Sequence, residues 1–252
     1  HGPDGSAWTE GNDVRVLVHG STYFGRLHEV VTRLEAGDLL CFTDWRGDPD
    51  ERLTGEPGSE VGQVLSAAAR RGVVVRGLLW RSHLDGLAYS ADENRHLGGE
   101  VNEAGGEVLL DQRVRPFGSH HQKLVVARGE NVDVAFAGGI DLCHSRRDDA
   151  EHGGDPQGMK MSQEYGDTPP WHDVQLEVRG PAVGDLEAVF RERWDDPAPL
   201  DNRARMAVER RLLDGLDTDA SKMPPQAPDP ARMGTCSVQV LRTYPARRSP
   251  YP

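Results

Sequence analysis

The segment His120-His121-Gln122-Lys123 carries a histidine and a lysine two positions apart, side chains that can act on a phosphate ester. The apolar residues 124–127 follow directly and predict a buried strand, on which side chains alternate between faces. His121 and Lys123 should therefore point the same way, and Gln122 the opposite way. An imidazole with a pKa of about 6.5 is largely neutral at neutral pH and can attack phosphorus, while a lysine ammonium neutralises phosphoryl oxygens.

A second apolar run at residues 132–137 predicts a hairpin with the first, joined by a turn near residues 128–131. Arms of similar length return Gly138 and Gly139 to the level of His121. Residues without side chains there would let backbone amides approach an anion. Asp141 should then lie beside His121, so Lys123, Gly138, Gly139 and Asp141 are the candidate phosphate-binding residues.

Alternating helix and strand patterns predict the elements that position these residues. We expect strands at residues 14–18, 39–43, 73–79, 107–110 and 174–178, and helices at 24–34, 61–68, 93–104, 181–194 and 204–213. This order predicts an α/β fold with a mixed, mostly parallel sheet flanked by helices on both faces. Ligands gather at the carboxyl ends of parallel strands. The possible rim residues are Trp45, Arg46 and Trp80, together with His120.

Two polar stretches interrupt the pattern. Residues 148–171 lack periodicity, and so long a loop favours a functional lid. Residues 223–230 contain four prolines and predict an extended linker. We place a boundary there, with one unit at residues 1–234 and the start of another, opened by a strand at 238–241, in residues 235–252.

Composition restricts the function further. The chain has 252 residues and 37% hydrophobic residues, enough for a full core, and a net charge of -12 that disfavours binding to nucleic acid or an anionic bilayer. Three scattered cysteines predict no disulfide framework and a reducing compartment. No secretory signal or run of about 20 apolar residues is present. We expect a cytoplasmic protein or one peripheral at a membrane surface, and, because no Met begins the chain, an excised segment.

Three segments together resemble the phospholipase D superfamily: residues 120–123, Gly138-Gly139-Ile140-Asp141-Leu142 and Arg146-Arg147-Asp148-Asp149. Residues 170–174 and 190–194 are similar to downstream segments of the amino-terminal half of phosphatidylcholine-cleaving members. The resemblance implies a phosphodiesterase that acts on phospholipids such as phosphatidylcholine. Its reaction passes through a phosphohistidine that water or an alcohol resolves, without a metal or other cofactor in the chemical step.

The resemblance also assigns roles to individual residues. His121 is the expected nucleophile, and Lys123 holds a phosphoryl oxygen. Asp141 stands near the phosphate, where many relatives have Asn. Asp173 is expected to hydrogen-bond the far nitrogen of His121 and so fix its tautomer.

Two departures from the family pattern stand out. Arg128 occupies the position where relatives usually have Asp, which puts the stability of the hairpin in doubt. The family's active site also needs two His-x-Lys halves, and this chain has one. The resemblance therefore implies that residues 1–234 form one catalytic half with its linker, and that a second half, beginning in residues 235–252, supplies the leaving-group acid in cis.

Other interpretations remain open. A metalloenzyme could use His120, His121, His172 and Asp173, although the ammonium of Lys123 would repel a divalent cation. A non-catalytic binding module and a single-motif homodimeric nuclease are further alternatives. By default, His120 has a supporting or solvated role, and residues 146–149 form a solvated, salt-bridged turn.

Overall fold

The computed structural model describes residues 7–81, 91–114, 118–158, 166–200 and 219–244. The helix expected at residues 204–213 lies outside this part of the chain. The elements follow the order β1 (Thr9–Val18), α1 (Gly20–Arg33), β2 (Leu39–Asp44), α2 (Val61–Arg70), β3 (Val74–Trp80), α3 (Ala91–Glu103), β4 (Glu107–Asp111), β5 (Lys123–Arg128), β6 (Asp133–Gly138), β7 (Val174–Arg179), α4 (Ala182–Trp194) and β8 (Cys236–Val238).

The described strands form one sheet in the order β4-β3-β2-β5-β6-β7-β1-β8. The α/β class and the mixed sheet are thus confirmed. The expectation of a mostly parallel sheet is wrong, because only β2–β3 and β3–β4 pair in parallel among the described strands. The β5–β6 hairpin enters beside β2, and β1 pairs with β7 rather than with β2, so the remaining pairs run antiparallel.

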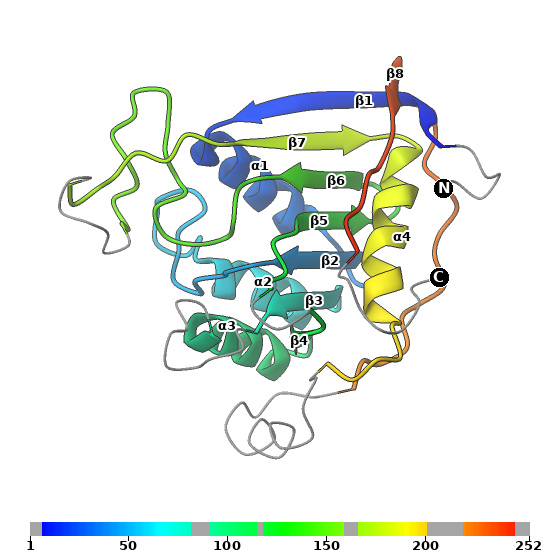
Figure 1. Cartoon of the computed structure of the whole chain (residues 1–252), viewed down its shortest axis with the longest axis horizontal. Helices are drawn as coiled ribbons and strands as arrows, with labels where there is room; N and C mark the ends of the chain where they lie inside the picture. The colour runs from blue at the N-terminus through cyan, green and yellow to red at the C-terminus, as the bar shows by residue number, and fades with distance from the viewer. Residues whose placement is uncertain (1–6, 82–90, 115–117, 159–165, 201–218, 245–252) are drawn as a thin grey trace.

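Helices cover both faces of the sheet (Figure 1). Helices α1, α2 and α3 bury their apolar sides against one face, where Phe24, Leu65 and Val101 join one core cluster. Helix α4 covers the other face through a second cluster that includes Phe190 and Trp194. None of the helices in the described residues has the length and apolar character needed to cross a lipid bilayer.

Arg128 links the hairpin that carries the His-x-Lys pair to α4 and to the proline-rich segment through hydrogen bonds. Its side chain is buried, and Nε donates to Asp133 Oδ1 at 2.7 Å across the hairpin. Nη1 donates to the buried carboxylate of Glu187 on α4, and Nη2 donates to the carbonyl oxygen of Pro228 at 2.6 Å. The arginine that replaces the family's Asp therefore ties the hairpin to two other segments.

The proline-rich segment is extended, as predicted, but it is fastened along α4. We call residues 219–235 the strap. Trp194 Nε1 donates to the carbonyl of Ser221 at 2.8 Å, and Gln226 Nε2 donates to the carbonyl of Gly184 at 2.9 Å. Figure 1 shows the strap and the chain after it running beside α4. The strand expected at 238–241 occurs as β8, shifted toward the N-terminus, and pairs with β1 at the edge of the sheet.

Candidate active site

His121 and Lys123 meet at the start of β5. Lys123 Nζ lies 2.9 Å from His121 Nδ1, and the lysine side chain is 2% exposed. Gln122 points to the opposite face, where its Oε1 accepts a hydrogen bond from Arg193 of α4. The alternation of side chains along a strand therefore predicted the pairing correctly.

Two carboxyl groups lie behind Lys123. Asp141 Oδ1 is 3.1 Å from Lys123 Nζ, as expected for a residue beside the His-x-Lys pair. Asp44, at the end of β2, accepts the backbone N–H of Leu142 at 2.9 Å, and its carboxyl group lies beside that of Asp141. Burial, followed by the charge of Asp141, raises the pKa of Asp44 well above its usual range. The raised pKa favours the protonated form of Asp44, and a proton there would reduce the repulsion between the two groups.

The residues after Asp44, Trp45 and Arg46, were expected at the rim of the site, but no role was expected for Asp44 itself. The available signal was a single acidic residue at the end of an apolar strand. Its pairing with Asp141 depends on β2 lying next to β5, which the sequence pattern did not reveal.

The environment of His121 favours the neutral imidazole. Partial burial lowers its pKa first, and the positive charge of Lys123 lowers it further. An ammonium can only donate hydrogen bonds, so Nδ1 accepts from Lys123 and the ring proton resides on Nε2. Attack through Nε2 would require this proton to move to Nδ1.

The structure shows no hydrogen bond between Asp173 and His121, both of which lie in its described part. Lys123 occupies Nδ1 of His121, and Asp173 Oδ1 accepts the backbone N–H of Val174 at 2.7 Å. The Asp173 carboxylate lies against Gly139, where an added Cβ would be 2.3 Å from Oδ1. In this structure Asp173 thus contacts the start of β7, and its expected role in orienting the imidazole stays a prediction.

The two glycines lie near the expected level but not at it, since Gly138 pairs in the hairpin register with Lys123, two residues after His121. Their expected role as anion-binding amides is not supported at Gly139, whose N–H donates to the carbonyl of Val174 at 3.1 Å. A Cβ on Gly138 would lie 2.6 Å from the same oxygen. The absence of side chains here allows β7 to approach β6 closely.

Of the expected rim residues, Trp45 lies beside His121 and contacts Trp80, whereas Arg46 is buried. The ring of Trp45 lies 5.8 Å from the ring of His121 and stacks on Trp80 at 5.7 Å with 15° between the planes. We call these two tryptophans the aromatic wall. Arg46 is not at the rim, because its side chain is 9% exposed and Nε donates to the buried Asp48 at 2.7 Å.

His120 lies on the α4 side of the sheet. Its Nε2 is 3.4 Å from Asp111 Oδ2, and its side chain is 12% exposed, so it is not solvated. Burial first, then the charge of Arg193, lowers its pKa. His120 therefore belongs to a buried polar cluster behind the site, in agreement with the supporting role.

Arg146 and Trp171 complete the surroundings, and sequence analysis gave Trp171 no role. The Arg146 guanidinium lies 3.6 Å above the Trp171 ring, and its Nε is 3.8 Å from Asp141 Oδ2. Arg146 is 7% exposed and Asp148 is fully buried, so the expectation of a solvated turn at residues 146–149 is wrong. An arginine held against a tryptophan face is well placed to add positive potential near Lys123.

The loop after β6 is anchored in its described part. Gln157 accepts the backbone N–H of Arg52 at 2.8 Å and donates to the carbonyl of Asp50 at 2.7 Å. Asp155 is also buried. These contacts fix residues 144–158 against the segment that precedes α2, and a lid role for this loop stays a prediction.

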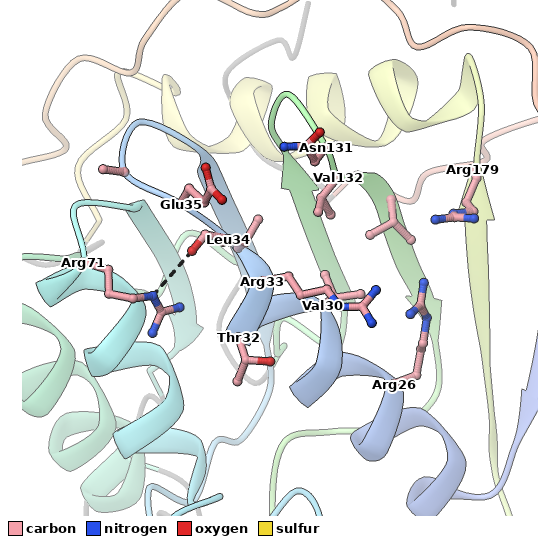
Figure 2. A pocket seen from close by; sticks show the side chains of 12 residues that line it. Arg26, Val30, Thr32, Arg33, Leu34, Glu35, Arg71, Asn131, Val132 and Arg179 are labelled. Atoms are coloured by element: carbon pink, nitrogen blue, oxygen red, sulfur yellow. Dashed lines mark hydrogen bonds between the residues drawn. The ribbon is translucent and has the colours of Figure 1, made fainter.

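Two cavities lie at opposite ends of the strands. One of about 480 Å³ adjoins His121 and is also lined by residues 241–244 beyond β8. A second of about 810 Å³, shown in Figure 2, lies at the hairpin turn and the end of α1. Its arginines are engaged within the protein: Arg26 pairs with Glu177, and Arg71 donates to the carbonyl of Leu34. His121 borders the smaller of these two cavities, together with its neighbours His120 and Gln122.

Comparisons with known proteins agree with this geometry. The family model described as Phospholipase D matches residues 34–248. Phospholipase D alpha 1 from Cynara cardunculus is 31% identical over 242 residues, which cover 78% of this chain and 28% of that protein. Phospholipase D1 from Saccharomyces cerevisiae is 26% identical over 270 residues, which cover 91% of this chain and 15% of that protein.

The chain thus spans less than a third of the length of these relatives. Among solved structures, a polyphosphate kinase from Porphyromonas gingivalis aligns with a TM-score of 0.42 and 12% identity over 82% of this chain and 26% of that one. The family match covers most of the sequence, including the His-x-Lys hairpin and its buried surroundings. The chain therefore belongs to the phospholipase D family.

Proposed function

We propose that this chain supplies the nucleophilic half of a phospholipase D-type phosphodiesterase. His121 attacks phosphorus, the headgroup alcohol leaves, and a phosphohistidine forms that water or another alcohol resolves. The observation that carries the proposal is the buried ammonium of Lys123 at 2.9 Å from an imidazole with a lowered pKa. A neutral nucleophile beside a fixed cation is the combination that phosphoryl transfer needs.

Lys123 has two tasks in this mechanism. It donates to His121 Nδ1 and lies 3.1 Å from Asp141. When a phosphate enters, its oxygens compete for the same ammonium. Transfer of Lys123 from Nδ1 to a phosphoryl oxygen would release Nδ1 to carry the ring proton and leave the lone pair on Nε2 for attack. Asp141 then keeps Lys123 in place, and Arg146 adds charge on the far side of Asp141.

The aromatic wall supports a phospholipid substrate. In an in-line displacement the leaving group departs opposite the attacking nitrogen. Trp45 lies beside His121, so it borders the phosphatidyl group that stays on the enzyme rather than the departing headgroup. Substitution of Trp45 by Ala should lower kcat/KM for long-chain phosphatidylcholine more than for a soluble phosphocholine ester. An equal loss for both substrates would contradict this placement.

An exposed apolar stripe supports a second phospholipase D-like half as the partner in cis. Val16, Val18, Val174 and Leu176 are 57%, 40%, 40% and 37% exposed. The β1–β7 register places them side by side on the sheet face that α4 covers farther along. Contiguous exposed apolar residues of this kind mark interaction surfaces. We propose that the second half covers this stripe and supplies the acid that protonates the leaving group.

Trapping of the phosphoenzyme tests the mechanism. The chain is produced together with its second half, mixed with labelled phosphatidylcholine and quenched. The expected product is an acid-labile, base-stable phosphoryl adduct on His121, and His121→Gln should reduce turnover by about 10³-fold or more. His96→Gln, a change at an exposed histidine on α3, is the matched control and should behave as the wild type. Normal turnover by His121→Gln would refute the proposal.

A further inference from the structure

Three histidines from distant parts of the chain converge at the end of the sheet near the site. His19 joins β1 to α1, His152 lies in the loop after β6, and His172 precedes β7. One possible ligand atom from each lies within 4.8 Å of the others. Their ring centroids are 5.0, 5.0 and 5.5 Å apart. We call these residues the histidine cluster, and none of them takes part in the proposed phosphoryl transfer.

His19 is the buried member of the histidine cluster. It is 9% exposed, and its Nδ1 is buried without a hydrogen-bond partner among the described residues. A buried polar atom without a partner is unfavourable, because it has lost its contact with water. Both neighbouring imidazoles meet the His19 ring edge to face.

His152 is held in a defined orientation. Its Nδ1 lies 3.0 Å from Oδ2 of Asp148, a fully buried residue whose Oδ1 accepts the backbone N–H of Gly154 at 3.1 Å. A carboxylate on one imidazole nitrogen fixes the tautomer and leaves the other nitrogen free to bind. Histidines that ligate metals commonly have such a carboxylate partner.

We propose that His19, His152 and His172 bind one divalent transition-metal ion, with zinc the best match to three neutral imidazoles. Zinc–nitrogen bonds of about 2.0–2.1 Å place the three nitrogens of a tetrahedral site about 3.4 Å apart. The ligand atoms now lie within 4.8 Å of one another, and small rotations of the exposed rings of His152 and His172 would bring them to this shorter separation. The fourth position would be open to water or an anion.

Such a site would cross-link three segments. The loop after β6 already contacts α1, because the N–H of Ser21 donates to the carbonyl of Asp148 at 3.0 Å, and the N–H of His19 donates to the carbonyl of Asp173 at 3.1 Å. A metal ion would add a stronger link at the same place. Arg146 and Trp171 flank the bridged loop, so the ion would stabilise the wall of the active site without entering the reaction.

The histidine cluster differs from the metal ligands that the sequence suggested, which were His120, His121, His172 and Asp173. His172 joins His19 and His152, whereas His121 pairs with Lys123. The ammonium of Lys123 repels a cation near His121, while the buried carboxylate of Asp148 favours one near His152. Charge therefore separates the two sites.

Metal titration of the tag-free, chelator-treated protein tests the proposal. Calorimetry with zinc should give one equivalent bound with a Kd in the micromolar range or below, and cobalt should give the visible absorption of a tetrahedral site. His152→Ala and His172→Ala remove exposed ligands and should each weaken binding at least 100-fold. Asp148→Asn should weaken binding by about 10–100-fold. His96→Ala should bind as the wild type does.

Two further readouts separate this proposal from the proposed function. Zinc should raise the Tm of the wild type but not that of the His152→Ala/His172→Ala variant, whose circular dichroism reports whether it is folded. His121→Ala should retain the zinc site. Equal zinc affinity in the wild type and the double variant, or loss of zinc in His121→Ala, would overturn the inference, whatever the outcome of phosphoenzyme trapping.

Discussion

Substitution of Arg128 by Met should destabilise the protein strongly. The methionine retains an apolar stem of similar length, but the hydrogen bonds to Asp133, Glu187 and the carbonyl of Pro228 are lost. Removal of one partner from a buried ion pair costs about 3–5 kcal/mol, because the other charge stays buried without compensation. Glu187 keeps its 2.7 Å contact with Arg191, so we expect a loss of about 3 kcal/mol, at the lower end.

Urea unfolding followed by tryptophan fluorescence measures this loss as a lower midpoint at unchanged slope. For a chain of this size, Tm should fall by about 2–4 °C per kcal/mol, which gives roughly 6–12 °C. Arg33→Met is the matched control. Arg33 is 66% exposed and pairs with Glu29, and such surface pairs contribute about 0–1 kcal/mol.

A second variant separates charge burial from lost packing. Arg128→Met/Glu187→Met removes both charges, so it should recover part of the stability that Arg128→Met loses. The reasoning would be refuted by a loss below about 1 kcal/mol for Arg128→Met, since a buried pair should exceed the range for surface pairs. Additive effects of the two substitutions would also refute it, because residues in direct contact should be coupled.

Three other predictions concern the site and the core. In an NMR titration, His121 should show a pKa below 6.5. Lys123→Met should raise this pKa, because it removes a neighbouring positive charge. An unchanged pKa in the variant would contradict the contact between Lys123 and His121. The neutral form then persists to lower pH, so the acid limb of kcat/KM should lie below the ordinary histidine range. Gly138→Ala should cost about 1–3 kcal/mol in urea unfolding, because the new Cβ meets the rigid carbonyl of Val174, whereas wild-type stability would refute the clash. Cys236 should be the only thiol to react with a disulfide reagent before unfolding, since the other two cysteines are buried; three reactive thiols in the native protein would contradict this burial.

Local features of the fold followed from the sequence, and non-local ones did not. The β5–β6 hairpin was predictable because its strands and turn are adjacent. Its register was predicted only to within two residues, since Gly138 was expected opposite His121 and pairs with Lys123. Hydrophobic periodicity carries no information on which distant strands pair. The placement of β1 beside β7 and of β5 beside β2 was therefore missed, and with it the antiparallel character of most of the sheet.

The same limit applies to the site. Strand alternation was sufficient to place His121 and Lys123 together, because it depends on neighbours in the chain. The pairing of Asp44 with Asp141 requires contact between elements almost a hundred residues apart. The role expected for Asp173 came from resemblance alone, and the backbone N–H of Val174 occupies one oxygen of that carboxylate.

The docked strap determines where the last described residues lie. Its contacts with α4 and the β8–β1 pairing deliver residues 241–244 to the cavity that His121 borders. If the proposed second half follows these residues, its point of attachment lies beside the cavity that His121 borders. Because the strap is docked along α4, the proline-rich stretch would add little free linker between the two halves, and a shorter free linker raises the effective concentration of one half at the other.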